Sequence, residues 1–143
     1  MKVAIIGSGP MVRYLPGRLR SSGHQVKLLR YPAESYAGGA EGADLVITLL
    51  PDSAAARLVY SELARRASPG QVFVDHSDLE PETAAWCALA LPAFLEAPIG
   101  ERGEIEVRGE RAHFERALPV LSAYADPVSL RDASDGREAP APA

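Results

Sequence analysis

The sequence predicts an α/β domain whose mainly parallel sheet is doubly wound, with helices on both faces. Short apolar runs alternate with segments of helical periodicity along the 143 residues, and the first run leads directly into the turn Gly7-Ser8-Gly9. Because a crossover between parallel strands needs a helix, this alternation favours a parallel sheet. With 47% hydrophobic and 24% charged residues, the composition is that of a globular protein. The length suits one ordinary core, so we expect a single domain over residues 1–131.

The first strand is expected over residues 2–6, and the helix after the glycine turn begins near Pro10. Proline suits the first turn of a helix, because the N–H that it lacks would have no partner there. Pro16 falls inside the same helix, where its ring clashes with the preceding turn and a backbone donor is missing. We therefore expect this helix to be kinked or broken near residues 13–16.

Apolar runs bounded by turn residues predict three further parallel strands, over residues 25–30, 44–50 and 71–75. Asp52 is a good N-cap for a helix that extends to about Ala67, where Pro69 and Gly70 end it. The helical spacing of its apolar residues predicts one buried face, formed by Ala55, Leu58, Val59 and Leu63.

The last third of the chain is expected to contain shorter elements: a helix over residues 81–92, strands over 93–95 and 104–108, a helix over 111–124 and a strand over 128–130. Residues 104–108 alternate polar and apolar side chains, which fits a half-exposed or edge strand. The segment 132–143 is rich in alanine, proline and charge, so we expect a disordered tail there.

The glycine turn is typical of Rossmann domains, which hold the pyrophosphate of a dinucleotide at this point. Gly7 permits the turn and Gly9 lets the backbone approach the phosphates, while the positive end of the helix attracts the anion. The third position of the pattern is Val12 instead of glycine, which is expected to push the helix away from the strand. Two interpretations stay open: a dinucleotide-binding domain, and a degenerate Rossmann scaffold that acts through protein contacts.

The end of the second strand bears on which dinucleotide is bound. An acidic residue there usually bonds the ribose hydroxyls of NAD, whereas this chain has Arg30. A guanidinium pairs with a 2′-phosphate, so NADP is favoured and NAD is possible; the alternative is a solvated arginine. Tyr31 either stacks on adenine or covers the sheet edge. The thirteen residues 31–43 hold at most a helical turn and a loop, so we expect a shortened edge on the adenine side.

Seven segments carry a family resemblance, over residues 7–11, 23–26, 43–53, 72–77, 81–83, 96–99 and 114–121. In order and spacing they resemble the N-terminal cofactor domain of the β-hydroxyacid dehydrogenase family, which includes 3-hydroxyisobutyrate and 6-phosphogluconate dehydrogenases. The resemblance covers residues 2–130. It implies a hydride-transfer enzyme that uses NAD(P) on a small hydroxy acid.

The resemblance also implies where each part of the cofactor binds. The pyrophosphate is expected at the turn formed by Gly7, Ser8, Gly9, Pro10 and Met11. The nicotinamide half is expected beside Leu50, Pro51 and Ser77, and the substrate beside the loop of residues 96–102. Arg30 and Tyr31, at the adenine end, complete the predicted cofactor site.

Departures from the family pattern gather where the chemistry should be. Gly100 stands where the family has a serine that binds a substrate carboxylate, and Asp78 replaces a threonine, which repels an anionic substrate. The family's catalytic lysine belongs to a C-terminal helical domain, and this sequence ends where that domain would begin. The only lysines, Lys2 and Lys27, belong to the early strands. We therefore expect no complete dehydrogenase from this chain alone, and a partner chain or second subunit would supply the proton donor.

His76 lies between Asp75 and Ser77, but these neighbours are not expected to form a catalytic triad, because successive residues at a strand end point in different directions. His24 and His113 belong to other elements, so no metal-ligand spacing is found. We therefore expect His76 to be a structural or cofactor-facing histidine.

The remaining features bear on compartment and partners. A net charge of −4 argues against a nucleic-acid surface. No apolar stretch approaches the roughly 18 residues of a membrane span, and no signal peptide is recognised, so we expect a cytoplasmic protein without a membrane partner. Cys87 is expected to be buried and inert, and Trp86 and Leu89 to lie in a helix core. Without a helical domain, apolar surface stays uncovered, which favours a homodimer.

Overall fold

The computed structural model describes residues 1–132, in which strands and helices alternate as the sequence predicts. The strands are β1 (Lys2–Gly7), β2 (Gln25–Arg30), β3 (Leu45–Leu49), β4 (Val72–Asp75), β5 (Phe94–Glu96), β6 (Ile105–Gly109) and β7 (Val128–Asp132). The helices are α1 (Pro10–Ser21), α2 (Ala37–Ala40), α3 (Ser53–Arg66), α4 (Pro81–Ala90) and α5 (Arg111–Leu121). Asp132 ends β7 and is not part of a tail, and the rest of the predicted tail lies outside the described residues.

The strands form one sheet in the order β2-β1-β3-β4-β5-β6-β7. Neighbours from β2 to β5 are parallel, whereas β6 runs antiparallel to β5 and parallel to β7. The prediction of a mainly parallel sheet is therefore confirmed. The chain leaves β1 for β2 on one side and returns to β3 on the other. Open α/β sheets bind ligands at such a switch point, outside the carboxyl ends of the strands.

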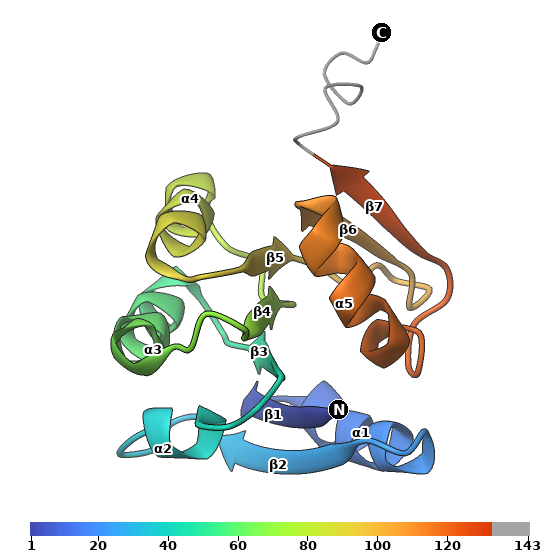
Figure 1. Ribbon diagram of the computed structural model, residues 1–143, viewed down its shortest axis with the longest axis horizontal. Helices are drawn as coiled ribbons and strands as arrows, with labels where there is room; N and C mark the ends of the chain where they lie inside the picture. The colour runs from blue at the N-terminus through green and yellow to red at the C-terminus, as the bar shows by residue number, and fades with distance from the viewer. Residues whose placement is uncertain (133–143) are drawn as a thin grey trace, which may run out of the picture.

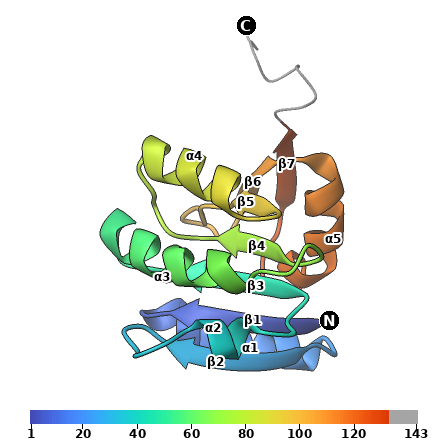
Figure 2. The same cartoon turned by 60° about the vertical axis from the view of Figure 1, so that its left-hand side comes forward.

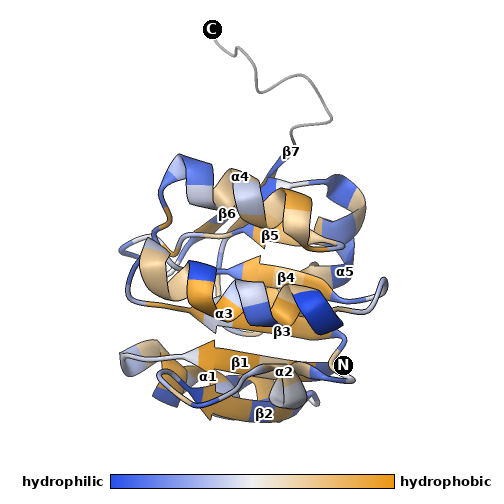
Figure 3. Cartoon of the chain, turned by 90° about the vertical axis from the view of Figure 1, so that its left-hand side faces the viewer, coloured by the Kyte–Doolittle hydropathy of each residue, from blue (hydrophilic) through white to orange (hydrophobic). Residues whose placement is uncertain are grey.

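Helices cover both faces of the sheet, so it is doubly wound (Figure 1). Alternate residues of β1 show the two layers, because Val3 and Ile5 pack with α1 and α5, whereas Ala4 and Ile6 pack with α2, α3 and α4. Figure 3 shows the apolar strands lying behind the mixed surface of α3 and α4. None of the helices within residues 1–132 is long and apolar enough to cross a membrane.

The first helix is not broken near Pro16, because α1 continues from Pro10 through Pro16 to Ser21, and the alternative of a kink stays a prediction. Val12, Leu15 and Leu19 form its buried face against the sheet. Tertiary packing of an apolar face supplies most of a helix's stability in proteins, so it outweighs the hydrogen bond that Pro16 cannot make.

The connection from β2 to β3 contains only the four-residue helix α2, and β2 is the outer strand of the sheet. Within residues 1–132 no strand lies beyond β2, as the sequence predicts. Figure 2 shows β2 at this edge, with α2 on the same face as α3. The short connection leaves the carboxyl end of β2 next to that of β1.

β6 is half-exposed, which was one of the two alternatives, and it is not an edge strand, because β7 pairs with it on the outer side. Two other predictions need correction. Leu58 is 62% exposed and Leu89 is 88% exposed, so neither belongs to the core. The other residues of the predicted face of α3, Ala55, Val59 and Leu63, are buried as expected, and α4 buries Cys87. The packing of each helix on the sheet sets its rotation, which leaves Leu58 and Leu89 outside the buried stripe.

Candidate functional site

Gly7 ends β1 where the chain lies directly against β3. A Cβ atom at this position would overlap the backbone carbonyl oxygen of Leu49. The amide of Ser8 donates to that same oxygen, with an N–O distance of 3.0 Å. Only glycine therefore fits at the end of β1, and the close approach draws the glycine turn against the end of β3.

Gly9 is the N-cap of α1 and has a φ of 97°, which side chains disfavour. A Cβ atom there would meet no atom within 4 Å, so the space in front of the helix is open. Pro10 begins α1, and no side chain caps the helix. The N-terminus of a helix attracts anions, so this open, uncapped end fits a phosphate group.

Val12 is completely buried beneath the first turn of α1, and its amide donates to the carbonyl oxygen of Gly9 at 3.2 Å. Met11 is half-buried and packs against the core on the α1 side. The helix therefore accommodates the β-branched side chain within its packing. The expected loss of alignment at the N–H groups stays a prediction, which ligand binding will test.

Arg30 and Tyr31 lie beside the glycine turn, because the last residue of β2 pairs with Gly7 in the register of the sheet. The amide of Tyr31 continues this ladder and donates to the Gly7 carbonyl oxygen at 2.8 Å. Arg30 is exposed and has no ion-pair partner within residues 1–132. Its guanidinium is therefore available to an anion at the outer end of the site.

Two tyrosines form an aromatic surface at this edge. The rings of Tyr31 and Tyr36 stack with centroids 6.1 Å apart and planes at 21°. Tyr31 is half-buried and packs against the core on the α3 side, so it also covers the sheet edge. The hydroxyl of Tyr36 accepts a 2.7 Å hydrogen bond from the amide of Ala33. No sequence motif marks Tyr36, because its place beside Tyr31 depends on the conformation of the connection between β2 and β3.

Glu62, on α3, fixes the start of α2. One carboxylate oxygen accepts from the hydroxyl of Ser35 at 2.6 Å and from the amides of Tyr36 and Ala37, each at 2.8 Å. The hydrogen bonds from Ser35 and from those amides lower the pKa of Glu62, so the carboxylate stays charged. No motif in the sequence marks this residue. Its role depends on a contact between α3 and a distant loop.

Leu50, Pro51 and Ser77 follow β3 and β4 at the same edge of the sheet as the glycine turn. The amide of Leu50 donates to the Ser77 hydroxyl oxygen at 2.7 Å. That hydroxyl lies 3.3 Å from Asp75 Oδ2, to which it donates. Leu50 and Ser77 are both buried. The hydrogen bonds of the Ser77 hydroxyl therefore join the segment after β3 to the segment after β4. Asp52 is the N-cap of α3, as predicted, and accepts from the amide of Ala55 at 2.8 Å.

His76 points away from Asp75 and Ser77. Its Nδ1 lies 2.6 Å from the carbonyl oxygen of Ala97, and its Nε2 lies 2.7 Å from the hydroxyl of Tyr124. A carbonyl only accepts, so Nδ1 carries the proton and Nε2 accepts from Tyr124. Burial lowers the pKa of His76 to about 4, so the ring is neutral. The expectation that these neighbours form no triad is confirmed, and His76 is structural.

Cys87 is fully buried in α4, as predicted, and burial raises the pKa of its thiol to about 12. A thiol in this state is unreactive, because the thiolate is the nucleophile. Within residues 1–132, no cluster of His, Cys, Asp or Glu has the arrangement of a metal site. The described residues thus offer neither a reactive thiol nor a metal centre beside the glycine turn.

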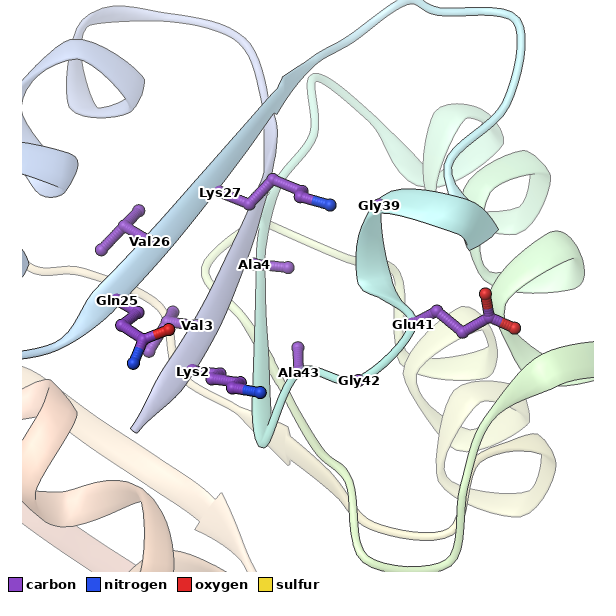
Figure 4. Close-up of a pocket in the computed structure, with 10 residues that line it drawn as sticks. All are labelled: Lys2, Val3, Ala4, Gln25, Val26, Lys27, Gly39, Glu41, Gly42 and Ala43. Carbon is purple, nitrogen blue, oxygen red and sulfur yellow. The ribbon is translucent and has the colours of Figure 1, made fainter.

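Two cavities flank the sheet at opposite ends of its strands. One, of about 500 Å³, adjoins Ser77 and is lined by Asp78, Glu96 and Arg108 among others. The other, of about 350 Å³, lies at the amino ends of β1 and β2 (Figure 4). Lys2 and Lys27 line this second cavity, far along the strands from the glycine turn. The lysines therefore lie away from the predicted cofactor site.

The predicted substrate loop connects β5 to β6 as a tight turn. The amide of Gly100 donates to the Glu104 carbonyl oxygen at 2.8 Å, and the amide of Arg102 donates to the Glu104 carboxylate at 2.9 Å. A Cβ atom at Gly100 would overlap that carboxylate. That carboxylate is the end of a flexible side chain, so a small side chain at this position would displace Glu104 from its hydrogen bond with Arg102.

The parallel sheet, the switch point at β1 and the open glycine turn define an NAD(P)-binding domain of the Rossmann class. Residues 2–131 match the family model of the NAD binding domain of 6-phosphogluconate dehydrogenase. The chain belongs to this family, which confirms the resemblance found in the sequence.

Similar proteins include an uncharacterized oxidoreductase of Shewanella frigidimarina, 31% identical over 86% of this chain and 53% of that protein. A probable 3-hydroxyisobutyrate dehydrogenase of Mycobacterium bovis is 28% identical over 90% of this chain and 48% of its own length. The structure of Mycobacterium tuberculosis 3-hydroxyisobutyrate dehydrogenase with L-serine has a TM-score of 0.82 and 24% identity, over 92% of this chain and 54% of that one. The chain spans about half the length of the curated relatives it matches.

Proposed function

We propose that the chain binds NADP(H) in preference to NAD(H), along the carboxyl ends of β2, β1, β3 and β4. The adenosine would lie beside Arg30 and Tyr31, the pyrophosphate at the N-terminus of α1, and the nicotinamide half beside Leu50, Pro51 and Ser77. The open space in front of Gly9 supports the pyrophosphate position. The choice of NADP rests on the exposed guanidinium of Arg30.

The geometry at the end of β2 supports this preference. Arg30 is next to Gly7 in the register, so its side chain starts from the strand beside the phosphate-binding turn. NAD is usually held at this strand end by a carboxylate that accepts from the ribose hydroxyls, and Arg30 offers donors only. The planar guanidinium can form two hydrogen bonds to a 2′-phosphate.

Within the whole protein we propose hydride transfer as the reaction, with bound NADPH supplying the hydride. We assign no catalytic residue to the described chain, because Lys2 and Lys27 line the cavity at the other end of the strands. A proton donor from a second subunit or a partner chain would complete the site. A homodimer and a cytoplasmic location stay proposals of the same kind.

Arg30→Asp should weaken NADPH binding by a factor of about 10 to 100, because charge-assisted hydrogen bonds are lost and a repulsive charge is added. NADH affinity should stay the same or rise. The measurement is calorimetric titration of the purified chain with each dinucleotide. Arg116→Asp makes the same charge change at an exposed residue of α5, and should alter neither affinity.

The titration also separates this proposal from the alternative of a scaffold without cofactor. Equal effects of Arg30→Asp on NADPH and NADH would remove the guanidinium from the site. Absence of heat and of thermal stabilisation with either dinucleotide at millimolar concentration would favour the scaffold that acts through protein contacts. The buried Val12 would then be the first residue to examine.

A further inference from the structure

We propose that Asp75, together with Tyr60 and Thr48, positions the two segments that hold the nicotinamide half of the dinucleotide. This inference rests on the proposed function and adds positioning residues to it. All three side chains are completely buried, so none of them can touch a ligand directly. They act through the segments that follow β3 and β4.

The carboxyl group of Asp75 is the centre of a buried hydrogen-bond network. Its Oδ2 accepts from the hydroxyl of Thr48 at 2.6 Å and from that of Tyr60 at 3.0 Å. The hydroxyl oxygens of Thr48 and Tyr60 also lie in direct contact, so their two protons are shared among three close contacts. Burial raises the pKa of Asp75, and these hydrogen bonds oppose that rise. The donors therefore hold the buried carboxyl group in a single orientation.

The oriented carboxyl group in turn fixes the chain beyond the two strands. Asp75 Oδ1 accepts from the amide of Ser77 at 2.8 Å, and Oδ2 accepts from the Ser77 hydroxyl. The same hydroxyl accepts from the amide of Leu50, so it joins the segment after β4 to the segment after β3. The ladder between these strands ends with the amide of His76 on the Thr48 carbonyl oxygen. The network thus continues the pairing past the end of the sheet.

The adenine end of the proposed site depends on different contacts. The amide of Tyr31 bonds to Gly7, and Glu62 holds the backbone of Tyr36 and Ala37. No hydrogen bond within residues 1–132 joins these groups directly to the Asp75 carboxyl group. A change in the network should therefore alter the nicotinamide half and leave the adenine half intact.

The test compares two ligands that share the adenine half. NADPH spans the whole site, whereas adenosine 2′,5′-bisphosphate lacks the nicotinamide half. Tyr60→Phe removes one donor and keeps the ring that packs edge-on against Phe73 and Phe94. We expect this variant, and Thr48→Val independently, to weaken NADPH about tenfold in calorimetric titration, with the bisphosphate affinity unchanged.

Tyr36→Phe is the matched control, because it removes a tyrosine hydroxyl from the adenine end. Any effect of this control should be equal for both ligands. The positioning role is overturned if Tyr60→Phe and Thr48→Val leave NADPH affinity unchanged, or weaken both ligands alike. If one variant fails to fold by circular dichroism, the other decides. A wild-type chain that binds neither ligand overturns the proposed function, and the positioning role with it.

Discussion

Gly7→Ala is expected to destabilise the chain by about 3 kcal/mol or more, which is a large share of the stability of a single domain. The added methyl group would overlap the backbone carbonyl oxygen of Leu49, and a strand backbone cannot move aside as a flexible side chain can. Relief would require β1 and β3 to separate at their carboxyl ends. The measurement is the free energy of unfolding in urea, at neutral pH, for wild type and variant.

Two further glycines give matched controls for this prediction. Gly17→Ala makes the same substitution in the exposed interior of α1, where nothing lies within 4 Å, and should stabilise the chain by up to about 1 kcal/mol. Gly9→Ala has the same free space but a φ of 97°, so it should fold with a moderate loss of stability and weaken NADPH. A Gly7→Ala variant as stable as wild type would disprove the close approach of β1 to β3.

The glycine turn illustrates what the sequence alone could predict about the site. An apolar run followed by Gly7 and Gly9 is a local pattern, and it correctly located the turn before α1. The physical reason for Gly7 is its contact with Leu49, which comes from another strand more than forty residues away. Such a reason depends on strand pairing, and a local pattern carries no information about it.

Wrong predictions for the helices have one cause in common. A break of α1 near Pro16 was one of two expectations, and Leu58 and Leu89 were expected in the core. Each expectation used a local rule, of propensity or of helical spacing. The packing of the whole helix on the sheet decides instead, because it fixes which stripe faces inward and outweighs one missing hydrogen bond.

The polar residues that organise the site had no motif in the sequence. Tyr60 and Glu62 lie in α3 at ordinary helical positions, and only the fold brings them to Asp75 and to the start of α2. Asp75 and Ser77 were noticed as the neighbours of His76, and Ser77 also through the family resemblance. Their shared hydrogen bonds depend on the end of β3. Long-range contacts of this kind become visible only once the strand order is known.

Acidification should destabilise the chain through His76, in the pH range from about 6.5 down to about 4. Burial lowers the pKa of His76 from 6.5 to about 4, so between these values the unfolded chain binds a proton that the folded chain excludes. Stability therefore falls as pH falls through this range. At about 1.4 kcal/mol per pKa unit, the full loss from this residue is about 3 kcal/mol.

Comparison of the wild-type chain with His76→Gln separates the contribution of His76 to the pH dependence of stability from the contributions of the carboxyl groups. Asp75 acts in the opposite sense, because its raised pKa favours proton uptake by the folded chain as pH falls. The free energy of unfolding is measured in urea at pH 7.5 and at pH 4.5 for both proteins. The variant should be less stable than wild type at pH 7.5, because it loses the buried ring and its contacts with Ala97 and Tyr124. It should lose less stability on acidification, because glutamine does not titrate. His24→Gln is the control for loss of a histidine remote from Ala97 and Tyr124. Equal losses on acidification in wild type and His76→Gln would mean that the folded protein admits a charged ring between Ala97 and Tyr124, contrary to the neutral ring that burial favours there.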